Sequence, residues 1–266
     1  MEKLALWTEA EGIDSVGDSF APWLETYLLD TTEPLGAVIV CPGGGYVGRA
    51  DHEAEPIARR YNELGYHAFV CHYSVSPRLH PQPIRDISRA VRLVRSRASQ
   101  WKVAPDRLAV LGFSAGGHLA ASLGVHWAKP FCADEGPLGA FSNEPNALIL
   151  CYAVMGGGPF GHDGCMDNLL GRDACKPERW LMQLDLHVTP ETAPAFLWST
   201  SDDAVVPVEN SLRFATAIRE AGGAFELHVY PKGAHGLGLV PGDAHIATWS
   251  GLSGDWLEGL GWPRKH

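Results

Sequence analysis

The sequence has no long hydrophobic run and no excess of positive charge. No stretch approaches the roughly 18 consecutive apolar residues that a membrane-spanning helix needs, so we expect no membrane span. The 21 lysines and arginines are outnumbered by 31 aspartates and glutamates, which gives a formal net charge of −10. This acidic balance argues against nucleic acid or an anionic membrane surface as a partner. The composition, 45% hydrophobic and 20% charged over 266 residues, is that of an ordinary globular domain.

Metal-binding and redox motifs are also missing. The 6 cysteines contain no C-x-x-C pair, the 12 histidines show no metal-ligand spacing, and neither H-E-x-x-H nor Gly-Lys-Ser/Thr occurs. We therefore expect no metal and no cofactor. Free, mostly buried thiols are typical of a reducing compartment. Residues 1–4 lack the charged segment and apolar core of a secretory signal, and no N-x-S/T sequon is present, so the sequence predicts a cytoplasmic location.

The chain alternates short apolar, β-rich runs with amphipathic helical patterns and shows no internal repeat. This alternation predicts one α/β domain over residues 1–266, with a mostly parallel twisted sheet and helices on both faces. Residues from about 155 to 190 interrupt the alternation, and we expect them to form a small cap-like insertion over the functional site. The expected strands are 37–41, 68–71, 108–111, 147–151, 195–198 and 225–230, and the expected helices are 53–64, 83–99, 115–127, 208–221 and 246–260.

A G-x-S-x-G motif, Gly112-Phe-Ser-Ala-Gly116, lies between an expected strand and an expected helix. Strand, tight turn and helix are the context of a nucleophile elbow, in which the central serine stands exposed above the sheet. A side chain at Gly112 or Gly116 would crowd the neighbouring backbone of such a turn. The expected helix directly follows the serine and directs the N–H groups of its N-terminus toward the same point. The motif therefore predicts Ser114 as a nucleophile.

A serine nucleophile needs a base, and the base needs an orienting acid. On a sheet of this type the chain order is serine, acid, histidine, each in a loop at the carboxyl end of a strand. Asp202 and Asp203 follow the expected strand 195–198, and His235 follows 225–230 in a loop flanked by glycines. We therefore predict His235 as the base. The residues alone leave the acid open, since one aspartate could orient His235 while the other caps the next turn.

Three consecutive glycines, 43–45, follow the expected strand 37–41. Glycines let backbone N–H groups turn into a site without obstruction, and an acyl-transfer enzyme needs such donors for the developing oxyanion. We expect the N–H groups of Gly44, Gly45 and Ala115 to form this oxyanion hole. The same loop fits the nucleotide motif G-x-G-x-x-G, but the next expected strand leads into residues 71–75 with no acidic residue to hold a ribose. Nucleotide binding is therefore disfavoured.

These motifs together resemble the α/β-hydrolase superfamily, and more narrowly a bacterial group of acetyl-xylan and feruloyl esterases often labelled as xylanases. The resemblance covers about residues 35–260, with Pro42 where a histidine usually stands. It implies the α/β-hydrolase fold and a triad of Ser114, Asp203 and His235. The motifs that carry it are Cys-Pro-Gly-Gly-Gly-Tyr at 41–46, Glu-Pro-Ile-Ala at 55–58, Gly-Phe-Ser-Ala-Gly-Gly-His-Leu-Ala-Ala at 112–121, Asp-Ala-Val-Val-Pro-Val-Glu-Asn-Ser at 203–211 and Gly-Ala-His-Gly-Leu-Gly at 233–238.

The sequence thus predicts a serine carboxylic-ester hydrolase whose partner is a small-molecule or oligosaccharide ester. The resemblance implies a short acyl group, acetyl, on a sugar or xylo-oligosaccharide. A xylanase would need two opposed carboxylates instead. The alternatives are an amidase or peptidase on the same triad, a feruloyl esterase, and a non-catalytic binding protein that retains the fold. Homo-oligomerisation is left open. Tyr46, Trp180 and Trp198 are candidate pocket aromatics, although core packing is favoured for each.

Overall fold

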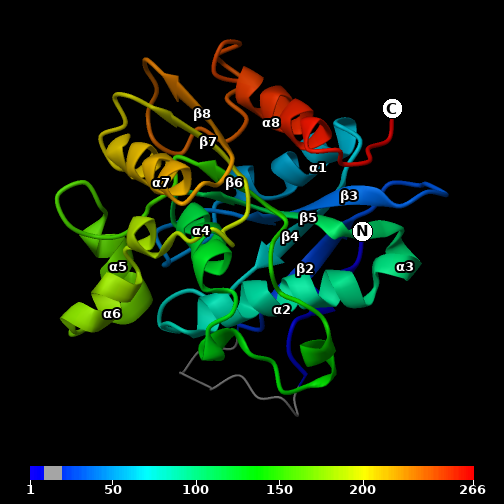
Figure 1. Cartoon of the computed structure of the whole chain (residues 1–266), viewed down its shortest axis with the longest axis horizontal. Helices are drawn as coiled ribbons and strands as arrows, with labels where there is room; N and C mark the ends of the chain where they lie inside the picture. Colours follow the sequence, from blue (N-terminus) through cyan, green and yellow to red (C-terminus); the bar gives the residue numbers. More distant parts are fainter. Residues whose placement is uncertain (9–19) are drawn as a thin grey trace.

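An eight-stranded sheet forms the centre of the computed structural model, which describes residues 1–8 and 20–266 (Figure 1). The strand order is β1-β2-β4-β3-β5-β6-β7-β8. Strands β3 to β8 are parallel to one another, whereas β2 is antiparallel to both β1 and β4. The predicted mostly parallel sheet is therefore confirmed. The strands are β1 (Lys3–Ala5), β2 (Trp23–Tyr27), β3 (Leu35–Cys41), β4 (His67–His72), β5 (Val103–Phe113), β6 (Ala147–Cys151), β7 (Ala195–Thr200) and β8 (Phe225–Tyr230).

Helices cover both faces of the sheet, as the alternating pattern predicts. Two of the expected helices are interrupted. In 83–99, Arg97 has φ −106° and ψ 11° and separates the main helix from a single further turn, and in 53–64, Ala54 has φ −104° and ψ −106° and separates a 3₁₀ turn from the helix that begins at Glu55. The helices are α1 (Glu55–Glu63), α2 (Gln82–Ser96), α3 (Ala98–Trp101), α4 (Ser114–His126), α5 (Asp163–Leu170), α6 (Lys176–Leu181), α7 (Glu209–Glu220) and α8 (Thr248–Gly259), with 3₁₀ turns η2 (Asp51–Glu53), η3 (Pro130–Cys132), η4 (Pro137–Ala140) and η5 (Leu184–His187).

Alternate residues of the central strands enter two separate cores. In β3, Ile39 packs into the core shared with α2, α4 and α7, whereas Val38 and Val40 pack against α1 and α8. Figure 1 shows α1 and α8 together on one side of the sheet and α2 and α4 on the other. Because both faces of β3 are covered, all of its residues are buried and the strand has a continuous apolar sequence. The sheet is thus a rigid base whose carboxyl edge carries the loops that follow β3, β5, β7 and β8.

The segment between β6 and β7 contains α5, α6 and η5 and lies at the left of the view in Figure 1. Three histidine side chains contact three successive carbonyls of this segment, one from within the segment and two from α4. His187 contacts the carbonyl oxygen of Trp180 at 3.0 Å, His126 that of Leu181 at 2.8 Å, and His118 that of Met182 at 3.1 Å. These carbonyls come at the C-terminal end of α6, where carbonyl groups lack donors within the helix, although that of Trp180 also accepts the N–H of Gln183 at 3.0 Å. The last two histidines belong to α4, so the segment is fixed to the helix that begins at Ser114.

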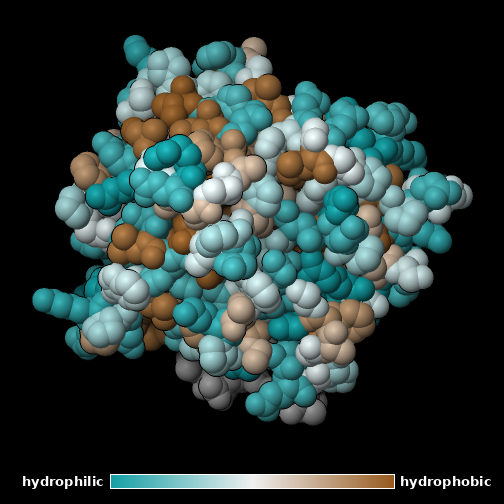
Figure 2. Space-filling view, viewed as in Figure 1, coloured by the Kyte–Doolittle hydropathy of each residue, from teal (hydrophilic) through white to brown (hydrophobic). Residues whose placement is uncertain are grey.

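The visible face of the molecule is mostly hydrophilic, with small hydrophobic patches, the most evident toward the upper left over α7 and β8 (Figure 2). Leu212 of α7 and Phe225 and Val229 of β8 are among the exposed large apolar side chains. Within the described residues, no helix combines the length and the apolar character needed to cross a bilayer.

Candidate active site

Ser114 lies at the junction of β5 and α4 with a left-handed backbone, φ +51°. Such a conformation is strained for a residue with a side chain, and strained residues concentrate at functional sites. The two flanking glycines are required by close approach. A Cβ on Gly112 would lie 2.0 Å from the carbonyl oxygen of Gly116, and a Cβ on Gly116 would lie 2.1 Å from that of Cys41. The local geometry is therefore that of the elbow expected from the motif.

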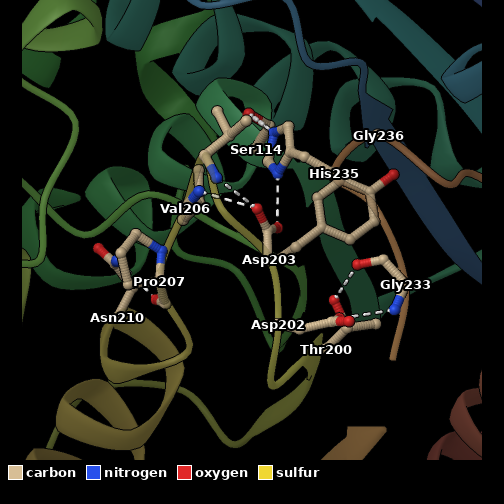
Figure 3. Close-up of polar contacts among 12 residues, drawn as sticks. Ser114, Thr200, Asp202, Asp203, Val206, Pro207, Asn210, Gly233, His235 and Gly236 are labelled. Carbon is tan, nitrogen blue, oxygen red and sulfur yellow. Dashed lines mark hydrogen bonds and ion pairs between the residues drawn. The ribbon is translucent and has the colours of Figure 1, made fainter. Parts of the chain in front are cut away.

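The imidazole of His235 joins Ser114 to Asp203 (Figure 3). Its Nε2 is 2.8 Å from Ser114 Oγ, and its Nδ1 is 2.7 Å from Asp203 Oδ2. An ionised carboxylate only accepts hydrogen bonds, so the Nδ1 proton of His235 points to Asp203. In the neutral ring, Nε2 is then free to accept the proton of the Ser114 hydroxyl. The three predicted residues, which are far apart in the sequence, thus form one hydrogen-bonded chain.

Asp203 is held as a charged group. Its other oxygen accepts the N–H groups of Val205 and Val206, each at 2.9 Å. Burial by itself raises the pKa of Asp203, but the hydrogen bond to His235 and these two N–H groups outweigh burial and lower the pKa below its ordinary value. The carboxylate therefore stays ionised at neutral pH.

The neighbouring Asp202 points elsewhere. Its Oδ1 accepts the N–H of Gly233 at 2.7 Å, and Figure 3 shows it directed toward that glycine and away from the His235 ring. Thr200 Oγ1 donates to the carbonyl oxygen of the same glycine at 2.7 Å. Asp202 thus fastens the loop that carries His235, while Asp203 contacts the imidazole. The geometry separates two neighbours that the residues alone left open.

The loop after β3 brings free N–H groups to Ser114. The carbonyl oxygen of Gly44 accepts the N–H groups of Val47 at 3.0 Å and Gly48 at 3.1 Å, which closes the loop into a tight turn. The N–H groups of Gly44 and Gly45 have no acceptor within residues 1–8 and 20–266. The Ala115 N–H, in the first turn of α4, has no carbonyl within its own helix to bind. All three donors of the predicted oxyanion hole are therefore available, and their role stays a prediction.

A cavity of about 210 Å³ opens at Ser114 and His235. Gly44 and Gly45 form one part of its wall, and His162 and Cys165, at the start of α5, form another. The segment expected to cap the site thus contributes to the cavity. The remaining lining residues are Ala50, His52, Glu53, Val154, Val205 and Gly236.

Two polar residues of the site had no signal in the sequence. Glu53, which is 2% exposed, accepts the N–H of Gly43 at 2.7 Å through Oε2. The Tyr152 hydroxyl donates to the other oxygen of Glu53 at 2.6 Å. An acidic residue near a helix start and a tyrosine after a strand are both commonplace, and neither belongs to a motif. Only their convergence in space indicates that they belong to the site.

The aromatic candidates and the cysteines lie as core packing predicts, except for Trp180 and Cys175. Tyr46 and Trp198 are buried, Trp180 is 57% exposed, and none of the three lines the cavity. All cysteines are free, and each is buried except the exposed Cys175. Among the residues that the structure describes, no group of three or more histidine, cysteine or acidic side chains could hold a metal ion.

The chain is similar to known esterases over nearly its whole length. The BD-FAE family model matches residues 24–150. The chain is 40% identical to an acetyl ester-xyloside bifunctional hydrolase from Caldicellulosiruptor lactoaceticus, with a TM-score of 0.91 over 98% of this chain and 96% of that one.

Two curated relatives are longer than this chain. Endo-1,4-beta-xylanase B of Butyrivibrio fibrisolvens is 38% identical over 92% of this chain and 39% of its own length. An acetylxylan esterase of Xylanibacter ruminicola is 30% identical over 87% of this chain and 47% of its own length. The chain thus spans less than half of either relative.

Proposed function

This chain belongs to the acetylxylan-esterase-like group of carboxylesterases in the α/β-hydrolase superfamily, and we propose that it is a serine esterase that removes acetyl groups from carbohydrate esters. The observation that carries the proposal is the hydrogen-bonded chain from Ser114 through His235 to Asp203, which opens into a small cavity. The substrate class is supported by the names of the relatives, and the acyl size by the limited space beside the serine.

The proposed reaction begins with attack of Ser114 Oγ on the acyl carbon while His235 Nε2 takes the hydroxyl proton. Asp203 holds the Nδ1 proton and stabilises the imidazolium that forms. The oxyanion is bound by the N–H groups of Gly44, Gly45 and Ala115, and loss of one such donor typically costs about 3–4 kcal/mol of barrier. His235 then protonates the departing alcohol, which leaves an acyl-enzyme. A water molecule, deprotonated by His235, attacks the acyl carbon and releases the acid and Ser114.

Glycoside hydrolysis needs a different arrangement, with two carboxyl groups on either side of the scissile bond. In the described lining of the cavity, Glu53 is the one carboxylate, and both of its oxygens already accept hydrogen bonds from the protein. The site therefore favours ester hydrolysis over cleavage of a xyloside.

The proposal is tested by hydrolysis of p-nitrophenyl acetate, butyrate and octanoate, followed by acetate release from acetylated xylo-oligosaccharides. We expect acetate to be preferred and Ser114→Ala to abolish turnover and labelling by a fluorophosphonate probe. Ser122→Ala is the matched control, because Ser122 is a buried serine of the same helix that contacts His118 and does not line the cavity. Turnover that survives in Ser114→Ala would refute the nucleophile. Faster turnover of a matched amide would favour an amidase.

A further inference from the structure

Glu53 is a buried carboxylate that the proposed reaction does not use. It lies in η2, directly before α1, and is 2% exposed. One oxygen accepts the N–H of Gly43, and the other accepts the Tyr152 hydroxyl. A buried carboxylate is costly unless it is hydrogen-bonded, so these two donors account for its presence. Gly43 in turn lies against the nucleophile, since a Cβ on this glycine would be 3.1 Å from Ser114 Cβ.

Tyr152 continues the chain of contacts from Glu53 to the histidine loop. Its hydroxyl accepts the N–H of Gly238 at 2.9 Å, three residues after His235. Its ring meets the His235 ring edge to face, with centroids 5.1 Å apart. Burial, and after it the negative charge of Glu53, raises the pKa of Tyr152 well above its ordinary value. The hydroxyl therefore keeps its proton and remains the donor to Glu53.

These contacts join loops that follow strands far apart in the sheet, and His52 beside Glu53 also contacts the carbonyl oxygen of Gly236 at 2.9 Å. Gly43 follows β3 and Gly238 follows β8, and three strands, β5, β6 and β7, lie between them. Tyr152 directly follows β6, with φ +37°, and so stands between the two loops. The path Gly43–Glu53–Tyr152–Gly238 therefore runs across the carboxyl edge of the sheet. A tyrosine held at positive φ is strained, and such strain is retained where the surrounding contacts demand it.

We infer that Glu53 and Tyr152 are positioning residues that set the distance between the N–H groups of the Gly44–Gly45 loop and the imidazole of His235. The inference rests on the proposed function, because both ends of the path belong to the proposed machinery. Donors and base must both be in place when the oxyanion forms, and a misplacement of about 1 Å can cost on the order of 100-fold in rate. We therefore expect the pair to act on the transition state.

The test uses Tyr152→Phe, Glu53→Gln and the double variant, with kcat and KM measured on p-nitrophenyl acetate. Phenylalanine keeps the ring packing on His235 and removes the hydroxyl. Glutamine keeps the shape of Glu53 but has one acceptor oxygen for two donors. We expect each variant to lower kcat and kcat/KM together, by about 10- to 100-fold, with KM within about twofold of wild type. The kcat of the double variant should lie within about twofold of the kcat of the less active single variant, because the two residues form one path.

Tyr61→Phe is the matched control. Tyr61 is also buried, and its hydroxyl is 2.7 Å from Ser253 Oγ, between α1 and α8. We expect its thermal midpoint to fall about as much as that of Tyr152→Phe while its kcat stays within about twofold of wild type. Tyr152→Phe is the milder of the two site variants and decides the question if Glu53→Gln does not fold.

Three outcomes would overturn the inference. Folded Tyr152→Phe with wild-type kcat would show that the path is structural only. Fully additive losses in the double variant would show that the two residues act separately. Absence of Ser114-dependent turnover in the wild type would remove the proposed function and this inference with it, and Ser114→Ala measured beside the variants identifies that case.

Discussion

Asp203, in the loop after β7, and Asp86, in helix α2, are both buried carboxylates, at 6% and 0% exposed, but their surroundings differ. Asp203 contacts an imidazole that can itself gain and lose a proton. Asp86 accepts hydrogen bonds from three neutral donors, at 2.7 Å each: the Trp7 ring, the Ser74 N–H and the Gln82 amide. It fastens the segments after β1 and β4 to α2. Burial of a carboxylate therefore does not make it a candidate for catalysis, whereas contact with an imidazole that faces the proposed nucleophile does.

The pKa values of the two carboxylates move in opposite directions. Burial raises the pKa of Asp86, and the hydrogen bonds from Ser74, Trp7 and Gln82 offset burial only in part. At Asp203 the hydrogen bonds to His235, Val206 and Val205 outweigh burial, and the pKa is lowered. The protein therefore favours the charge of Asp203 and opposes that of Asp86.

The largest effect expected from this contrast is the loss of activity in Asp203→Asn. The asparagine amide cannot hold the Nδ1 proton of His235 as a carboxylate does, so the ring loses its preferred tautomer and its imidazolium loses a counter-charge. We expect kcat on p-nitrophenyl acetate to fall on the order of 10³- to 10⁴-fold, the range seen for such acids in serine triads. Circular dichroism should show a folded protein. A loss below about tenfold in folded protein would contradict the role of Asp203.

Asp86→Asn should reverse the pattern, with stability lost and activity retained. In the wild type, three N–H donors bind the carboxylate oxygens of Asp86. In the variant, the amide nitrogen takes the place of one oxygen and leaves at least one of these donors without an acceptor. Leaving such a buried donor unpaired typically costs about 1–3 kcal/mol. Urea denaturation at pH 7 should show this loss in the free energy of unfolding, while kcat per folded molecule stays within about twofold of wild type. A large fall in kcat at unchanged stability would mean that Asp86 in α2 contributes to catalysis, and the distinction between a structural Asp86 and a catalytic Asp203 would be wrong.

The pH dependence of stability sharpens the comparison further. Asp203 has a folded pKa below its ordinary value of 3.8, so its stabilising contribution is present above that pH and is lost as pH falls through the folded pKa. Asp86 has a folded pKa above 3.8, so its contribution becomes less favourable as pH rises from 3.8 through the folded pKa. Urea denaturation between pH 3 and 7 gives the free energy of unfolding of the wild type and of each Asn variant. The difference between wild type and variant, plotted against pH, has one slope for Asp203 and one for Asp86. We expect slopes of opposite sign, and equal slopes would refute the assignment.

Most of the sheet and the residues of the hydrogen-bonded chain could be predicted from the sequence. The central strands are apolar runs separated by helices, and the order of Ser114, the aspartates and His235 follows from strands that end at one edge. Strands β1 and β2 are not among the expected strands. The three residues of β1 carry no pattern, and β2 is antiparallel to both of its neighbours and so lies outside the alternation of parallel strands and helices. Glu53 and Tyr152 could not be predicted either, because their importance depends on contacts between segments 99 residues apart.

The smallest expected effect distinguishes Asp202 from Asp203. Asp202→Ala removes the acceptor of the Gly233 N–H, but Thr200 still binds the carbonyl oxygen of that glycine, so the histidine loop keeps one of its two anchors. We therefore expect kcat to fall less than about fivefold, a range appropriate to loss of one exposed hydrogen bond. Asp202→Asn is the control, since its side-chain oxygen can still accept the Gly233 N–H, and it should match wild type. If Asp202→Ala instead loses activity as severely as Asp203→Asn, the carboxylate of Asp202 must reach His235 during the reaction. The assignment of Asp202 to the loop and of Asp203 to the imidazole would then be wrong.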